Sequence, residues 1–374
     1  MDKKYTSFGQ NFGQVILISG RGYDTMTKNR IEGLDIIRSL AIFCIILAHS
    51  IETNSPVNSI EEFNNLSAFA KALYFSFYAI GRIGVPLFFI LSGYLLLPRN
   101  FDSLKTKQFY KNNFLPLLLA WELWIPANNW LATWFLGLPF HTSSILKEMF
   151  FIERGSIPHS WYMPVILGIY LFVPYISRVL KTISNKEFLL PMSIVYIYLF
   201  VIPTINSFKL GNWVPVLDLS FSGGLYGTYV ILGYLLYRFT PKPKSSLKLI
   251  LFILISIALT TYAEIYFFAS KEYLYPLWYE FFLIPPTAIA IFVLFRDVKI
   301  NKIAGLVERI AKCSFGMYLI HVFFIAAFLK FEILSFIIND EFRGIILTLL
   351  VYVLSFIAVM LIKKLPYIGK ILVR

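Results

Sequence analysis

Apolar segments long enough to cross a lipid bilayer recur along this chain and leave little choice of fold. A helix needs roughly 20 apolar residues to cross about 30 Å of hydrocarbon. Segments near or above this length stand at 34–51, 73–97, 114–136, 162–177, 190–205, 220–237, 249–268, 277–295, 314–336 and 344–362. With 58% hydrophobic residues, the chain is also far more apolar than a soluble domain. The sequence therefore predicts an all-α, polytopic transmembrane helix bundle of about ten helices.

The basic residues predict which ends of these helices face the cytoplasm. Most of the 34 Lys and Arg fall in the N-terminal tail, in alternate connections and at the C-terminus. The opposite connections contain only Lys71, Lys147, Arg154, Lys209, Lys271 and Arg343. By the positive-inside rule, this asymmetry places both termini in the cytoplasm. It also accounts for most of the net charge of +13, so that no nucleic-acid partner is expected.

The same pattern divides the chain into two parts. Residues 1–29 are polar and are predicted to form a disordered cytoplasmic tail, whereas residues 30–374 form one membrane-embedded domain. The longest predicted connections, 52–72 and 137–161, lie on the outer side. Neither is long enough for a large soluble domain. An active site is therefore expected within the helix bundle and its mouths.

The first predicted helix, LDIIRSLAIFCIILAHSI, carries three polar residues that make it the main functional candidate: Asp35, Arg38 and His49. Charged and titratable groups in a spanning helix are costly and usually face the bundle interior. At 1.5 Å per residue, Arg38 and His49 lie on one face about 16 Å apart. Asp35 lies one turn before Arg38 and joins that face. We therefore expect these three residues to carry the catalysis.

Each of these residues also has a structural interpretation. His49 can accept a proton from a hydroxyl or carry an acyl group, or it is hydrogen-bonded to a neighbour at the headgroup level. Arg38 can bind an anion or a developing oxyanion, or it forms a structural ion pair with Asp35. The sequence leaves both interpretations open.

Four further residues are predicted to contact a substrate: Arg82, Glu122, His321 and Lys111. Arg82 is a second arginine inside a span and is expected to face the same cavity, or else to be paired structurally. Glu122 lines the cavity or lies at the membrane interface. His321 is expected about two turns inside the cytoplasmic surface. There it contacts a substrate or is packed and hydrogen-bonded.

Several other features have simpler interpretations. His141 and His159 are expected in outer loops, and Gly93 is expected at a close helix contact. The segments LSGYLLLP at 91–98 and ILGYLLYR at 231–238 are alike, which a tyrosine at the membrane interface explains. The two cysteines have no metal-ligand spacing, and no metal site is expected.

Four segments together resemble the acyltransferase type 3 family, whose members are integral membrane enzymes that acylate sugars of surface polysaccharides. The segments are NRIEGLDIIRSLAIFCIILAHS at 29–50, GVPLFFILSGYLLL at 84–97, SWYMPVILGIYLFVPYI at 160–176 and CSFGMYLIHVFF at 313–324. The first helix of this family carries a basic residue, ten spacers and a histidine. Arg38 and His49 have that spacing.

The resemblance implies an O-acyltransferase of the bacterial cytoplasmic (inner) membrane that transfers acetyl from cytoplasmic acetyl-CoA to a hydroxyl of a surface polysaccharide or lipid-linked glycan. His49 would be a general base or a transient acyl carrier, and Arg38 and Arg82 would stabilise anionic groups. Lys111 lies in a lysine-rich loop that would attract the CoA phosphates, although the positive-inside rule alone explains that loop. Polysaccharide-assembly proteins are expected as partners.

Two positions depart from the family pattern. After the second helix the family commonly has a pair of arginines before a proline, whereas this chain has Asn112 and Asn113 before Pro116. The acidic residue that many members place in the GVxLFF segment is Pro86 here. The first departure bears on how the acyl donor is bound.

Two other functions fit the same pattern. Ten helices around a polar cavity also suit a transporter or exporter of a glycan or lipid-linked sugar, although no convincing inverted repeat is present. A non-catalytic scaffold within a polysaccharide-assembly complex is the other alternative. Only the acyltransferase predicts that His49→Ala removes an ester from the surface glycan.

Overall fold

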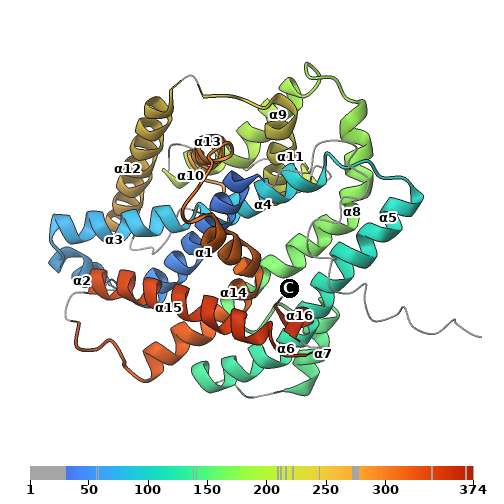
Figure 1. The fold of residues 1–374 in the computed structure, drawn as a ribbon. Helices are drawn as coiled ribbons and strands as arrows, with labels where there is room; N and C mark the ends of the chain where they lie inside the picture. The colour runs from blue at the N-terminus through green and yellow to red at the C-terminus, as the bar shows by residue number, and fades with distance from the viewer. Residues whose placement is uncertain are drawn as a thin grey trace, which may run out of the picture.

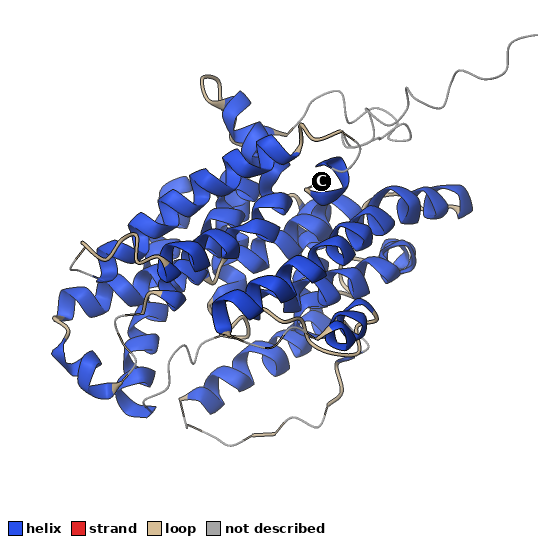
Figure 2. Ribbon diagram, turned by 90° about the horizontal axis from the view of Figure 1, so that it is seen from below, coloured by secondary structure: helices blue, strands red, loops and turns tan. Residues whose placement is uncertain are grey.

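The computed structural model describes residues 31–55, 57, 59–137, 139, 141–208, 210, 213–214, 217–220, 223–243, 245–271, 278–337, 340–366 and 369–373. This part of the chain contains helices, turns and loops and no strand, as Figure 2 shows. The all-α prediction is thus confirmed. The predicted tail, residues 1–29, lies outside the described residues.

The helices follow one another with short connections. The α-helices are α1 Glu32–Thr53, α2 Ile60–Asn65, α3 Ala68–Gly81, α4 Gly84–Leu96, α5 Ser103–Phe109, α6 Leu115–Leu136, α7 Thr142–Met149, α8 Tyr162–Thr182, α9 Leu189–Tyr196, α10 Ile202–Ser207, α11 Gly224–Phe239, α12 Ser246–Lys271, α13 Ile284–Phe295, α14 Ala304–Lys330, α15 Asp340–Ile362 and α16 Gly369–Leu372. The π-helical turns Tyr110–Phe114 and Ile197–Val201 join α5 to α6 and α9 to α10, and the 3-10 turn Pro158–Trp161 leads into α8.

Seven helical segments among the described residues are long and apolar enough to cross a membrane. They are Glu32–Thr53, Ala68–Leu96, His159–Thr182, Leu189–Ser207, Ser246–Ser270, Ala304–Lys330 and Phe342–Ile362. The protein is therefore a multi-pass membrane protein. Every predicted span overlaps at least one helix, and those at 73–97 and 190–205 each contain more than one. The number of ten spans and the cytoplasmic position of the termini remain predictions.

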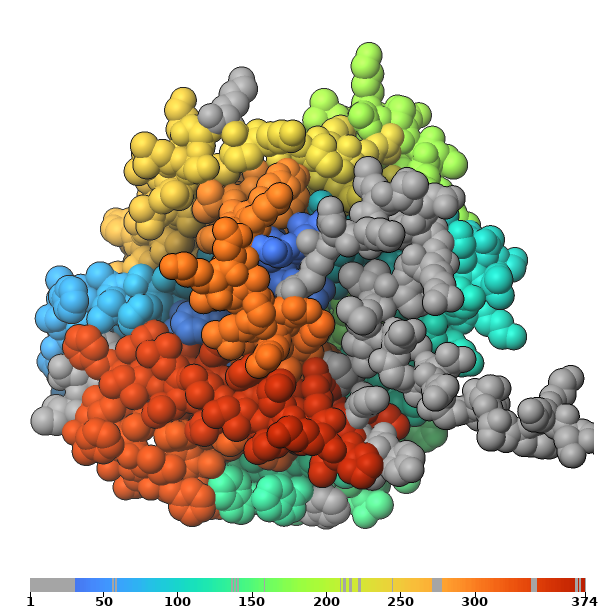
Figure 3. Space-filling view, viewed as in Figure 1, coloured from blue at the N-terminus to red at the C-terminus, as the bar shows by residue number. Residues whose placement is uncertain are grey.

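Helix α1 lies in the middle of the bundle. It packs against α3, α4, α13, α14 and α15 (Figure 1). Apolar residues lie all around α1, as is typical of a helix enclosed by other helices. In the face shown in Figure 3, α14 and α15 cover the centre and the lower left of the molecule, and only a small area of α1 is visible. The first predicted helix is thus the one that the rest of the chain surrounds.

Pro86 explains why the second span is broken into α3 and α4. A proline inside a helix lacks a donor N–H, and its ring collides with the carbonyl four residues earlier. That carbonyl belongs to Arg82, where α3 ends. The break lies directly against α1, because a Cβ atom on Gly81 would lie 2.8 Å from Ala48. Arg82 is therefore placed beside the last turns of α1.

Two glycines allow α4 and α11 to cross at backbone contact. A Cβ atom on Gly93 would lie 1.8 Å from the carbonyl oxygen of Val230, and one on Gly233 would lie 2.0 Å from that of Ile90. The close contact predicted for Gly93 is thus confirmed. The two similar segments at 91–98 and 231–238 face each other at this crossing.

The helix that carries His321 begins earlier than the predicted span. Helix α14 begins at Ala304, ten residues before the predicted span, so that His321 lies about 25 Å along the helix axis from its start. His49 lies equally far from the start of α1. His321 therefore lies as far along its helix as His49 does, because the basic segment before residue 314 continues the same helix, and its distance from the cytoplasmic surface remains a prediction.

Candidate functional site

Three of the four histidines meet at one place in the bundle, and we call His49, His159 and His321 the histidine triangle. They come from α1, from the turn Pro158–Trp161 and from α14. The ring centroids of His49 lie 6.0 Å from His159 and 5.4 Å from His321, and those of His159 and His321 lie 5.1 Å apart. His159 and His321 are 2% and 0% exposed. The side chain of His49 is 22% exposed, which makes it the accessible member.

The backbone of α14 determines the tautomer of His321. Its Nδ1 lies 2.7 Å from the carbonyl oxygen of Tyr318. Because a carbonyl only accepts, Nδ1 carries the proton and Nε2 has a free lone pair. Nε2 is buried and has no hydrogen-bond partner among the described residues.

Tyr318 also holds His159 in place. The Tyr318 hydroxyl donates to the backbone carbonyl of His159 over 2.7 Å, and the two rings lie 5.4 Å apart. Both ring nitrogens of His159 are buried without a partner in the described part of the chain. His159 does lie in a connection between helices, as expected. It is, however, buried in the site, because Tyr318 draws that connection onto α14.

A carboxylate links His49 to Arg82. Oε2 of Glu52 lies 3.2 Å from Nδ1 of His49, and Oε1 pairs with the Arg82 guanidinium. Since a carboxylate only accepts, Nδ1 of His49 carries the proton and Nε2 has the lone pair. An imidazole oriented in this way by a third group is the arrangement of a general base.

Aromatic residues enclose the Arg82 side chain, which is 4% exposed. Its Nε donates to the Tyr78 hydroxyl over 2.5 Å, and Nη1 lies 3.5 Å from the Tyr279 hydroxyl. The guanidinium carbon lies 4.2 Å from the centroid of the Trp278 ring. These contacts and Glu52 engage every nitrogen of the guanidinium. Arg82, predicted to contact substrate, here holds Glu52 in position.

Aromatic side chains also gather beside the turn that carries His159. We call Trp161, Tyr226, Trp278 and Tyr279 the aromatic cluster. The Trp161 ring lies 5.0 Å from Tyr226, 6.3 Å from Trp278 and 5.7 Å from Tyr279. All but Tyr279 are partly exposed. The cluster thus connects the turn that carries His159, through Trp161, to the Trp278 ring that contacts Arg82.

Arg38 and Asp35 lie nearer the start of α1. Nη1 of Arg38 lies 4.0 Å from Oδ1 of Asp35, so the structural ion pair is present. Tyr170 of α8 lies near the Arg38 side chain. The π-helical turn that contains Lys111 meets the next residue of α8, because the Tyr110 hydroxyl donates to the Leu171 carbonyl over 2.7 Å. Arg38 and this turn therefore approach the same part of α8.

The two remaining predicted substrate contacts, Lys111 and Glu122, lie in the turn before α6 and on α6. Lys111 is exposed. Glu122 is half-buried on α6, next to the exposed Leu123. In the described part of the protein, no hydrogen bond or ion pair joins either residue to the triangle. Their roles remain predictions.

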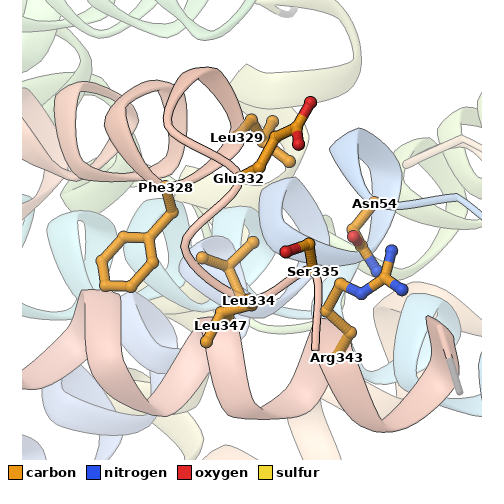
Figure 4. Close-up of a pocket in the computed structure, with 8 residues that line it drawn as sticks. All are labelled: Asn54, Phe328, Leu329, Glu332, Leu334, Ser335, Arg343 and Leu347. Carbon is orange, nitrogen blue, oxygen red and sulfur yellow. The ribbon is translucent and has the colours of Figure 1, made fainter. Parts of the chain in front are cut away.

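A cavity of about 260 Å³ lies beyond the end of α1, between the ends of α14 and α15 (Figure 4). Its lining residues are Asn54, Phe328, Leu329, Glu332, Leu334, Ser335, Arg343 and Leu347. None of the three histidines lines it. Within the described ranges, no group of three or more His, Cys, Asp or Glu has the geometry of a metal site.

Sequence reasoning missed Glu52 and assigned His159 to a loop. Glu52 stands three residues after His49, a spacing that brings two side chains together on a helix. This signal was hidden because the predicted span ended at residue 51, whereas α1 continues to Thr53. His159 is recognisable only from the tertiary structure, since α14 buries it.

Two curated relatives of the chain are amino-acid racemases of Enterococcus faecalis. One is 24% identical over 289 residues, which cover 71% of this chain and 37% of that protein. The other is 29% identical over 174 residues, which cover 46% of this chain and 22% of that protein. The chain thus spans little more than a third of the first relative, and the name describes that longer protein. No solved structure matches the chain significantly.

A family comparison covers much more of the chain. The sequence profile described as an acyltransferase domain matches residues 31–364, which is nearly the whole protein. The matched range contains the histidine triangle, Glu52, Arg82 and the helices that carry them. This multi-pass membrane protein therefore belongs to the acyltransferase type 3 family.

Proposed function

We propose that the protein is an O-acyltransferase of the bacterial cytoplasmic membrane that transfers acetyl from acetyl-CoA to a hydroxyl of a surface polysaccharide or lipid-linked glycan. The observation that carries this proposal is the contact of His49 with Glu52, which leaves Nε2 of His49 as a base on an accessible histidine. Acyl transfer to a hydroxyl needs such a base, because the hydroxyl must lose its proton as it attacks.

The reaction needs one proton transfer in each direction. Nε2 of His49 accepts the proton of the acceptor hydroxyl while the hydroxyl oxygen attacks the thioester carbonyl carbon. The new C–O bond forms, the C–S bond breaks, and the thiolate of CoA receives the proton from His49. The products are an ester and free CoA, and His49 returns to its starting state.

Glu52 and Arg82 support this base. When His49 holds the second proton it is a cation, which the Glu52 carboxylate stabilises through Nδ1. Arg82 fixes the carboxylate by pairing with its other oxygen. Because the aromatic residues around Arg82 hold the guanidinium in turn, His49 is oriented by groups that cannot easily rearrange.

The aromatic cluster supports a glycan as the acceptor. Sugar rings present apolar C–H faces beside their hydroxyls, and aromatic rings offer matching apolar faces. Trp161 is two residues from His159 and is partly exposed. A sugar stacked on the cluster would therefore hold its hydroxyls close to the histidine triangle.

The donor is proposed to enter from the opposite end of α1. Arg38 and the π-helical turn with Lys111 approach α8 there, and both carry positive charge. The CoA moiety is anionic, and cationic side chains bind phosphate groups. Asn112 and Asn113 stand where the family commonly has arginines, so Arg38 and Lys111 are the cations proposed to bind the donor.

The test is analysis of the surface glycan of the host. Cells with the intact gene, without the gene and with His49→Ala are compared by mass spectrometry of the purified glycan. We expect an acetyl ester only with the intact gene. The His49→Ala cells must contain as much membrane-inserted protein as the cells with the intact gene. An ester that persists in the His49→Ala cells would refute the proposal. A smaller amount of surface glycan that is still fully esterified would favour a transporter.

A further inference from the structure

The histidine triangle contains one more base than the reaction requires. Nε2 of His49 accepts the proton of the reacting hydroxyl in the proposed function. Nε2 of His321 is a second lone pair in the same place, since the two rings are 5.4 Å apart. It is completely buried, and no described residue donates to it. Leaving a buried acceptor unpaired is costly, which points to a ligand that supplies the missing donor.

The tautomer of His321 defines the chemistry of that ligand. Because Nδ1 donates to the Tyr318 carbonyl, Nε2 can only accept a hydrogen bond. A carbonyl, a phosphate or a carboxylate cannot satisfy it. The ligand group must carry an O–H or N–H.

His159 can supply the hydrogen-bond donor that Nε2 of His49 and Nε2 of His321 lack. A neutral imidazole has one N–H and one lone pair, and neither nitrogen of His159 has a partner in the described structure. Its ring centroid is 5.1 Å from His321 and 6.0 Å from His49. An oxygen atom bound between the rings can therefore donate to one histidine and accept from His159.

We propose that the acceptor binds through two neighbouring hydrogen-bond donors, as in a 1,2-diol or a hydroxyl beside an N-acyl group. This inference rests on the proposed function and narrows its acceptor. The reacting hydroxyl donates to Nε2 of His49, and the donor on the adjacent carbon donates to Nε2 of His321. His159 donates to one of the two oxygens.

His321 is then a residue that determines specificity. An acceptor whose reacting hydroxyl has no O–H or N–H on an adjacent carbon would bury Nε2 of His321 without a partner. A site built to pair with a substrate hydroxyl discriminates strongly against an analogue that lacks it. The enzyme should therefore modify ring positions that have a free neighbouring donor.

Two substitutions of His321 separate its two nitrogens. In His321→Asn the amide N–H lies where Nδ1 was and can still donate to the Tyr318 carbonyl, but the acceptor in the triangle is lost. In His321→Gln the amide reaches the position of Nε2 and its oxygen can replace that acceptor. The acceptor probe is the host's surface glycan from which esters have been removed by mild alkali, with acetyl-CoA as donor.

We expect His321→Asn to lower kcat/KM for the glycan by at least about tenfold, mainly through a higher KM. The KM for acetyl-CoA should stay unchanged, and His321→Gln should recover most of the loss. Nuclear magnetic resonance of the wild-type product should place the ester next to a carbon with a free O–H or N–H. This last measurement does not depend on the folding of any variant.

The outcomes distinguish the two proposals. If wild-type protein gives no ester that depends on His49, the proposed function and this inference both fail. If the ester is present but lies between positions without a free donor, the inference alone is overturned. It is also overturned if His321→Asn acts like wild type, or if Asn and Gln reduce activity equally in folded protein.

Discussion

Oε2 of Glu52 lies 3.2 Å from Nδ1 of His49, on the side of the imidazole opposite to the nitrogen that is left as a base. The other oxygen of the same carboxylate pairs with the buried Arg82. A single residue therefore connects the orientation of the base to the packing of the bundle. The contact predicts separate effects on activity and on stability.

Glu52→Gln should lower kcat by roughly 100-fold, because the amide cannot stabilise His49 as a cation and can present its own N–H to Nδ1. Acetyl transfer from acetyl-CoA to the de-esterified glycan measures the effect. Glu61→Gln is the control, since Glu61 is an exposed acid on α2. Activity of Glu52→Gln within twofold of wild type would contradict the role given to Glu52.

Arg82→Met should lower the free energy of unfolding by about 3 kcal/mol, because it leaves the partly buried Glu52 carboxylate without its cation. Thermal unfolding in detergent measures this loss. Tyr279→Phe is the matched comparison, since it removes only the 3.5 Å contact to Nη1 and should cost no more than about 1 kcal/mol. Equal stability of Arg82→Met and wild type would show that the ion pair contributes nothing.

Gly93→Ala should destabilise the protein by about 1–3 kcal/mol, because its Cβ atom would meet the Val230 carbonyl and force α4 away from α11. Gly168→Ala is the control and is expected not to destabilise the protein. Gly168 lies inside α8 with open space around its Cβ position, and alanine there should be neutral or stabilise by up to about 1 kcal/mol. The prediction fails if both variants unfold at the same temperature.

Trp161→Ala should raise the KM for the glycan about tenfold, equivalent to about 1.4 kcal/mol, without changing the KM for acetyl-CoA. The reason is the loss of an apolar face on which a sugar ring stacks. Trp161→Phe should retain most of the affinity. Trp130→Ala serves as a control, because Trp130 is 56% exposed on α6 and stacks on Trp134 instead.

Asp297 predicts a dependence of stability on acid pH. The hydrogen bonds from Arg296 hold the pKa of this carboxyl below its ordinary value. Its stabilising effect is therefore complete above the unfolded pKa of about 3.9 and disappears as the pH falls through the lower folded value. Because the carboxylate is 62% exposed, the effect should be small.

Asp297→Asn isolates this contribution. Between pH 7 and about pH 3, wild-type protein should lose more thermal stability than the variant, since only the wild type has this carboxylate to protonate. The unfolding midpoints of both proteins at the two pH values measure the difference. Identical shifts would mean that the contact with Arg296 does not stabilise the folded state.

The sequence alone predicts the class of the fold and the part of the site that lies on the first helix. Apolar length predicts the helices, and Arg38 and His49 predict that a face of the first helix is turned to the bundle interior, since charged groups in a span rarely face lipid. The position of Gly93 at a helix crossing is also predictable, because a residue without a Cβ atom allows two helices to come close. These features depend on one helix at a time.

The rest of the site depends on how helices meet. Hydropathy places the end of a span only to within a few residues, and this margin removed Glu52 from the predicted first helix. The start of α14 at Ala304 lies outside the predicted span for the same reason. The burial of His159 and the pairing of Arg82 with Glu52 follow from contacts between distant segments, which no local pattern encodes.

Tyr318 contacts two of the three histidines, but not the third. Its carbonyl accepts from the His321 ring, and its hydroxyl donates to the backbone of His159. Tyr318 thus holds these two rings at a fixed spacing by joining the turn Pro158–Trp161 to α14. The distance from His159 and His321 to His49 depends instead on the packing of α1 against α14. An acceptor that enters between α1 and α14 would therefore change the distance from His49 to the other two histidines. The spacing of His159 and His321 would stay the same.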